Sequence, residues 1–187
     1  MTRTMVAAAA LTLALGAVPA LAQTSTTTTT TDTGTTAQAG QLAEADQTFV
    51  EKAAQDSIAE IDLGELAKER AESEEVKQFA QRMIDDHGKA NEQLEEIAKS
   101  KGAVIPTEAG EEHSKLRAEL GELEGEAFDQ KYMAAMAEDH QKAVDLFQKQ
   151  AEEGQDPELK SFAEQTLPTL KEHLSMAQEM VQQAQAQ

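Results

Sequence analysis

Three of the four histidines in this sequence occupy core-facing positions of helical repeats, where an imidazole could bind a metal. His87, His140 and His173 each fall on a stripe of apolar residues whose spacing alternates between three and four. Glu60 falls on the corresponding stripe of a fourth segment. Each of the four residues is near the middle of its segment, so antiparallel packing would bring them to one level of a bundle.

Imidazole and carboxylate groups are ligands for zinc, copper or iron. The spacing therefore predicts a transition-metal site whose ligands are Glu60, His87, His140 and His173, one from each of four helices. The alternative is structural, because a buried neutral histidine can simply hydrogen-bond a neighbouring acid or water. Three methionines within a turn of the histidines would suit Cu(I), but flexible core filling is the favoured interpretation for Met83, Met136 and Met176.

Several charged neighbours of these histidines are expected to lie outside the site. An acid precedes each of the three, at Asp86, Asp139 and Glu172. Consecutive residues on a helix point about 100° apart, so these acids are expected to be solvated charges beside the site. The fourth histidine, His113, stands among charged residues and is expected to be exposed.

The elements that must position these residues are helices, because heptad-like spacing extends over residues 44–184. Ser73 and Asp156 have the side chains of helix N-caps, and Gly102 and Gly154 mark helix ends. The pattern predicts four long helices, over about 46–70, 73–101, 125–153 and 156–183, and a short one over about 107–120.

The two halves of this region repeat one another. Residues 75–81 match residues 158–164, which places Phe79 and Phe162 at equivalent positions. Short loops within each half make its two long helices antiparallel neighbours, and the long joining stretch can cross the length of the bundle. The predicted fold is all-α: a ferritin-like four-helix bundle of two antiparallel pairs, with a long crossover that carries a short helix.

Composition narrows the range of functions. The 187 residues include no cysteine, which excludes disulfides, thiolate metal sites and cysteine catalysis. The 35 acids outnumber the 16 bases, which argues against a nucleic acid partner. No catalytic triad order, phosphate loop or dinucleotide fingerprint is present. Non-enzymatic function is therefore favoured.

The N-terminal region resembles an export signal. Arg3 precedes an apolar run, and Ala20 to Ala22 offer the small residues that a signal peptidase requires. The predicted organisation is a signal peptide over 1–22, a disordered threonine-rich spacer over 23–43, the helical domain over 44–184 and a tail over 185–187. The mature chain is expected to be periplasmic or otherwise exported, without a transmembrane span.

Several sequence blocks resemble the DUF4142 family. The blocks begin at Phe49, Ala59, Phe79, Tyr132 and Thr166, stand in the family's order and span about residues 44–182. The resemblance implies an exported bacterial domain with a ferritin-like fold, in a family whose members often carry an outer-membrane label. It implies no activity.

Iron-handling ferritin-like proteins provide a useful contrast, because their di-iron sites use Glu-x-x-His motifs on two helices. Here the residues three positions before the histidines are Ile84, Ala137 and Leu170, so oxidase chemistry is disfavoured. The expected function is transition-metal binding, in envelope stress or metal homeostasis. The alternative is a non-enzymatic stress-protective or interaction protein whose buried histidines are structural.

Overall fold

The computed structural model of the chain describes residues 42–186, all of whose regular structure is helical. The all-α prediction is therefore confirmed for this part of the chain. The expected signal peptide and nearly all of the expected spacer lie outside the described residues. The helices are α1 (Glu44–Arg70), α2 (Glu74–Ser100), α3 (Glu111–Gly121), α4 (Gly125–Glu153) and α5 (Pro157–Gln185).

Local sequence signals determine several of these helix ends. The Ser73 hydroxyl accepts the backbone N–H groups of Glu75 and Val76, and the Asp156 carboxylate does the same for α5. Gly102 adopts a φ of 66°, in the left-handed region that favours glycine. The predicted start of the short helix at Thr107 was wrong: α3 begins only after Gly110, whose extended backbone precedes the first helical turn.

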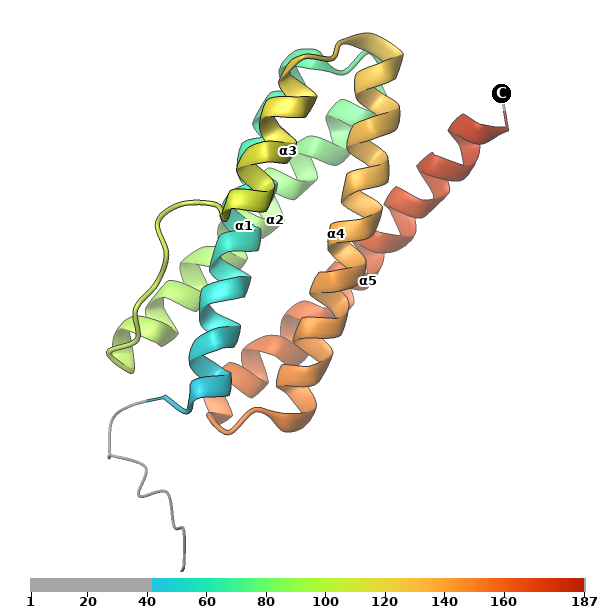
Figure 1. Cartoon of the computed structure of the whole chain (residues 1–187). Helices are drawn as coiled ribbons and strands as arrows, with labels where there is room; N and C mark the ends of the chain where they lie inside the picture. Colours follow the sequence, from blue (N-terminus) through green and yellow to red (C-terminus); the bar gives the residue numbers. More distant parts are fainter. Residues whose placement is uncertain (1–41, 187) are drawn as a thin grey trace, which may run out of the picture. The chain divides into compact units, whose positions relative to one another are not determined.

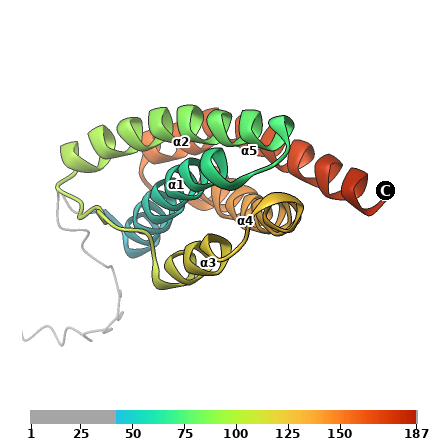
Figure 2. The same ribbon diagram turned by 90° about the horizontal axis from the view of Figure 1, so that it is seen from above.

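The four long helices pack as two antiparallel pairs, α1 with α2 and α4 with α5 (Figure 1). α1 also packs beside α4, and α2 beside α5. Seen from above, α2 and α5 form one layer, α1 and α4 form the next, and α3 covers the far side of α1 and α4 (Figure 2). α3 belongs to the long connection from α2 to α4, as the sequence predicted.

Two apolar clusters fill the bundle, one toward each end. The first contains Phe79, Phe128 and Tyr132, and the second contains Phe49 and Phe162. On each long helix the residues of one cluster precede those of the other, and the gap between them holds one buried ionisable residue. These four residues are Glu60, His87, His140 and His173. The predicted polar layer at mid-bundle is therefore present, although its four members are not all in mutual contact.

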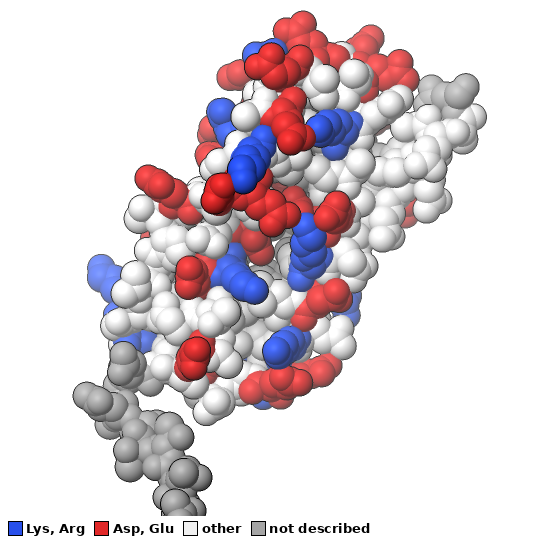
Figure 3. Space-filling view, viewed as in Figure 1, with Lys and Arg blue, Asp and Glu red and all other residues white. Residues whose placement is uncertain are grey.

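Charged side chains cover much of the surface. On the side that carries α3, acidic side chains gather over α3 and the adjoining part of α4, with lysines and arginines between them (Figure 3). Within residues 42–186, none of the helices has an apolar stretch long enough to cross a membrane.

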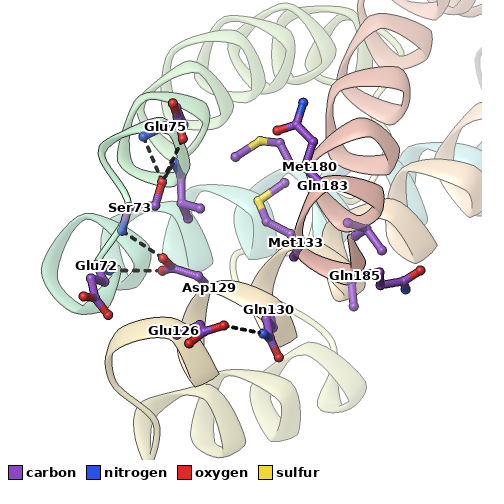
Figure 4. A pocket seen from close by; sticks show the side chains of 14 residues that line it. Glu72, Ser73, Glu75, Glu126, Asp129, Gln130, Met133, Met180, Gln183 and Gln185 are labelled. Carbon is purple, nitrogen blue, oxygen red and sulfur yellow. Dashed lines mark hydrogen bonds between the residues drawn. The ribbon is translucent and has the colours of Figure 1, made fainter. Parts of the chain in front are cut away.

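Two carboxylates tie the helix pairs together at opposite ends of the bundle. At the start of α1, Asp46 accepts the backbone N–H groups of Gln155 and Asp156 at 3.1 and 2.9 Å. At the start of α4, Asp129 accepts those of Glu72 and Ser73 at 3.1 and 2.8 Å (Figure 4). In both cases the donors are the N-cap residue of the other pair's second helix and the residue before it. The two halves therefore share a reciprocal contact as well as sequence similarity.

Candidate metal centre

Helices α2, α4 and α5 bring His87, His140 and His173 together in the middle of the bundle. Their exposed fractions are 7%, 1% and 1%, and one nitrogen from each ring lies within 4.8 Å of the others. The Nε2 atoms of His87 and His140 are 3.4 Å apart. Two imidazoles bound to one tetrahedral zinc ion, at ordinary Zn–N lengths, would have their nitrogens about 3.3–3.5 Å apart. This spacing therefore fits a shared metal ion.

The backbone of α4 orients the ring of His140. Its Nδ1–H donates to the carbonyl oxygen of Met136, one turn earlier, at 2.9 Å. With the proton on Nδ1, the Nε2 lone pair is free and faces His87. A hydrogen bond on the far ring nitrogen is the usual way in which proteins hold a histidine ligand.

An acid from another helix orients His173. The Nε2–H of His173 donates to Oδ2 of Asp86 on α2, at 3.2 Å. This leaves Nδ1 as the lone-pair nitrogen, and that atom is buried with no hydrogen-bond partner in the described structure. A buried acceptor without a hydrogen-bond partner is rare in folded proteins, and this one fits a role as a ligand atom.

The expectation that Asp86 is only a solvated charge was therefore wrong. Its carboxylate also contacts Arg82 at 3.4 Å and Lys89 at 3.7 Å, so it links the histidine to the charged surface. The 100° step between consecutive helix residues turns the side chain of Asp86 away from that of His87. Helical periodicity could not show that α5 places His173 beside Asp86. Glu172 does lie at the surface, in an ion pair with Arg82 at 2.9 Å.

Burial keeps these imidazoles neutral. It lowers the pKa of His87 well below its ordinary value, and the neighbouring His140 and His173 act in the same direction. Burial and His173 lower the pKa of His140 to about 4. Burial also lowers the pKa of His173, although the Asp86 carboxylate opposes that shift. Only neutral imidazole binds metal, so the cluster is in the binding-competent protonation state at neutral pH.

Phe79 closes one side of the cluster. Its ring centroid lies 6.5 Å from those of both His140 and His173, in edge-on orientations. The residue is only 5% exposed. The equivalent Phe162 contacts Phe49 and Phe147 instead, so the two repeat positions have different neighbours.

Glu60, the fourth predicted ligand, lies at the other edge of the His140 ring. Its Oε1 is 3.7 Å from His140 Nδ1, whereas the lone-pair nitrogen of His140 faces His87. The structure therefore does not bring Glu60 into the three-histidine group, and its role as a ligand stays a prediction. Glu60 is 4% exposed, and its Oε2 has no hydrogen-bond partner among the described residues. Burial, with the nearby Asp139 and Asp56, raises the pKa of Glu60 well above its usual range.

Beside Glu60 is a cavity of about 400 Å³ between α1, α3 and α4, here called the carboxylate cavity. It is lined by Asp56, Glu60, Glu111, Glu112 and Asp139, together with Lys52, Lys142, His87, His113 and His140. The prediction that His113 is exposed was wrong, since its side chain is only 17% exposed. Its Nε2 lies 4.0 Å from Asp56 and 3.8 Å from Asp139, because α3 folds back over α1 and α4.

A larger cavity, of about 610 Å³, lies at the end of the bundle where α2 and α4 begin and α5 ends (Figure 4). Met133 and Met180 contribute apolar surface, and Glu75 and Glu126 contribute charge. It contains no histidine, and its best-placed carboxylate, Asp129, already accepts two backbone hydrogen bonds. The size of this cavity alone therefore does not indicate a metal site.

The fold and this centre define an all-α domain with three clustered imidazoles in its core. The chain belongs to the family described as "Domain of unknown function (DUF4142)", whose model matches residues 31–180. The expected family is thus confirmed. No curated protein gives a significant match. Among solved structures, the chain resembles the "Crystal structure of DUF305 fragment from Deinococcus radiodurans". The TM-score is 0.68 at 18% identity, with 76% of this chain and 99% of that chain covered, so the likeness concerns the fold alone.

Proposed function

We propose that this protein is an exported, ferritin-like helical bundle that binds one transition-metal ion at His87, His140 and His173. The observation that carries the proposal is the meeting of three buried imidazoles, each with one ring nitrogen within 4.8 Å of the others, and one of them, His173, has a buried Nδ1 without a hydrogen-bond partner. Three neutral imidazoles suit zinc, copper or iron. The signal-like N-terminus supports loading outside the cytoplasm, in envelope stress or metal homeostasis.

Glu60 would contribute in one of two ways. In the observed geometry its Oε1 lies 3.7 Å from His140 Nδ1, outside the three-histidine group, where its charge would act on the ring without ligating the ion. A rotation of its side chain would be needed for it to ligate directly, as the sequence predicted. Because no Glu-x-x-His motif accompanies the cluster, the site is proposed as a binding centre and not as an oxidase.

One observation favours a second candidate, in which the histidines are structural. The 3.4 Å separation of His87 Nε2 and His140 Nε2 also fits a hydrogen bond between two neutral rings. The protein would then be a metal-free stress-protective or interaction domain with an acidic surface.

Titration of Zn(II), Cu(II) and Cu(I) into metal-free protein distinguishes these functions. Wild type should bind one ion, His87→Ala should bind far more weakly, and His113→Ala should match wild type at equilibrium. Equal binding by all three proteins would place the ligands on the acidic surface. No binding by wild type would leave the structural alternative.

A further inference from the structure

Among the described residues, two cavities that border the histidine cluster differ in size, and the carboxylate cavity is the larger of these two. On the other side, a hollow bordered by His87, His173, Phe147 and Leu170 has a volume of only about 20 Å³. That is about the space of one water molecule, and its lining is mainly apolar. The carboxylate cavity, at about 400 Å³, includes both His87 and His140 in its wall.

The depth of this cavity shows in the burial of its lining. Lys52, Glu111, Glu112 and Lys142 are exposed, so they lie toward solvent. Asp56 and Asp139 are partly buried, and Glu60, His87 and His140 are buried. The lining thus leads from exposed charges, past two acids, to the histidines.

Carboxylate oxygens in this cavity lack partners. Glu60 Oε2 and Asp139 Oδ2 are both buried and accept no hydrogen bond from any described residue. His113 Nε2 stands between Asp139 and Asp56 but is beyond hydrogen-bond distance of both, at 3.8 and 4.0 Å. Lys142 reaches Asp139 at 3.3 Å, but it is shared with Glu112 and Glu138. Unsatisfied buried oxygens of this kind favour a bound cation.

We propose that divalent metal ions reach the three-histidine cluster through the carboxylate cavity, where the carboxylates of Asp56, Glu60 and Asp139 attract the ion without forming a metal site of their own. The cavity oxygens would hold an ion only weakly, and the imidazoles, whose softer nitrogen donors bind zinc or copper more tightly, would retain it. The proposal rests on the function proposed above. It adds an entry route that the three histidines alone do not require.

The test separates the loading rate from the final affinity. The variant Asp56→Asn/Asp139→Asn removes two cavity charges and keeps side-chain size. Its matched control is Asp62→Asn/Asp145→Asn, which removes one charge from α1 and one from α4 at positions that do not line the cavity. For each metal-free protein, stopped-flow absorbance follows the removal of Zn(II) from a weak colorimetric indicator, and equilibrium titration gives the Kd.

At low salt the cavity variant should load about tenfold more slowly than wild type, since acids outnumber lysines in the cavity lining and charged clefts raise on-rates by roughly 10- to 1,000-fold. The Kd of the histidine cluster should stay within about threefold, because its three ligands are intact. The control should load within about twofold of wild type, since scattered surface charges are largely screened.

Equal loading by the cavity variant and its control would overturn the proposal while leaving the three-histidine site in place. A loss of equilibrium affinity as large as the loss of rate would also overturn it, because the carboxylates would then belong to the final site. A wild type that binds no Zn(II) would overturn the proposed function and this inference together. Should the double variant unfold, Asp56→Asn alone, at a partly exposed position, should still load more slowly than Asp62→Asn.

Discussion

The two edges of the His140 ring face opposite kinds of surroundings. On the Nε2 edge is His87, and the rings of His173 and Phe79 also pack against His140, with centroids 5.3 and 6.5 Å away. On the Nδ1 edge is Glu60, backed by a cavity that contains Asp56, Asp139 and exposed charges. The first side has almost no free volume, whereas the second has a hollow of about 400 Å³.

The difference follows from what burial does to bases and acids. A histidine can enter a core cheaply, because it becomes neutral near physiological pH and keeps one donor and one acceptor. A carboxylate that is buried without partners must either take up a proton or attract a cation. The base side can therefore close without metal, while the acid side keeps unsatisfied oxygens and a route to solvent.

The largest expected effect is the loss of stability on removing a buried phenylalanine ring, either Phe79 beside the histidines or its repeat equivalent Phe162. Phe79→Ala and Phe162→Ala should each lower the free energy of unfolding by about 3–5 kcal/mol, since both rings are almost fully buried. Only Phe79→Ala should also raise the histidine pKa values, because water would then reach His140 and His173. Urea unfolding and NMR titration measure the two effects. A loss below about 1 kcal/mol at either position would contradict the repeat-based equivalence.

The next largest effect is the loss of stability at low pH that the buried histidines should cause in metal-free protein. The pKa of folded His140 is lowered to about 4, so the unfolded chain takes up its proton first as the pH falls from about 6.5. Stability should therefore be full above pH 6.5 and decline toward pH 4, with His140 contributing roughly 3 kcal/mol. His87 and His173 shift in the same direction.

Urea unfolding between pH 4 and pH 8 checks this slope. His140→Gln should have a flatter profile than wild type, and His113→Gln is the matched control that removes a histidine outside the cluster. A profile for His140→Gln as steep as that of wild type would show that folding does not lower the pKa of His140.

A smaller effect is expected from the acid that supports the closed side. Asp86→Ala removes the acceptor of His173 Nε2–H and should weaken metal binding by about 10- to 100-fold, the usual scale for groups that orient a ligand. Asp85→Ala, at the adjacent exposed position, should bind like wild type. Equal affinities of these two variants for Zn(II) would mean that His173 needs no orientation by Asp86.

Periodicity predicted the residues of the histidine cluster but not its geometry. The stripes on four helices placed Glu60 and the three histidines at one level, because α-helical rise is uniform and the pairs are antiparallel. They could not show which edge of the His140 ring faces His87. That depends on the Nδ1–H bond to Met136 and on side-chain rotamers, which leave no repeating trace in the sequence.

The contacts that sequence reasoning missed are between residues far apart in the chain. Asp86 with His173, His113 with Asp139, and Asp46 with the turn before α5 all join different helices. Each of these acids looked like an ordinary surface charge, since acids are common throughout this chain. The contact of His113 with Asp139 depends on where α3 lies, and the predicted start of α3 was four residues too early. A short helix with few apolar residues gives little signal for its own packing.

The smallest expected effect is the gain in stability on removing the charge of Asp56, on the Glu60 side of His140. Burial, with Asp139 close by, raises the pKa of Asp56 to about 6, although His113 and Lys52 oppose the shift. The folded chain therefore holds this proton more tightly than the unfolded chain does. The Asp56 contribution should lower the free energy of unfolding as the pH rises from about 4 to about 6.

Asp56→Asn should remove this cost and be more stable than wild type at pH 7.5 by less than about 1 kcal/mol, since the side chain is 35% exposed and partly screened. The gain should vanish near pH 4, where the carboxyl group of Asp56 is mostly protonated in folded wild type. Asp62→Asn, on the same helix, should show no such trend. Urea unfolding of metal-free protein at both pH values measures the difference, and a variant less stable than wild type at pH 7.5 would mean that Asp56 gains more from His113 than it loses by burial. In that case the acid side would be as well satisfied as the histidine side, and the contrast between the two edges of His140 would rest on volume alone.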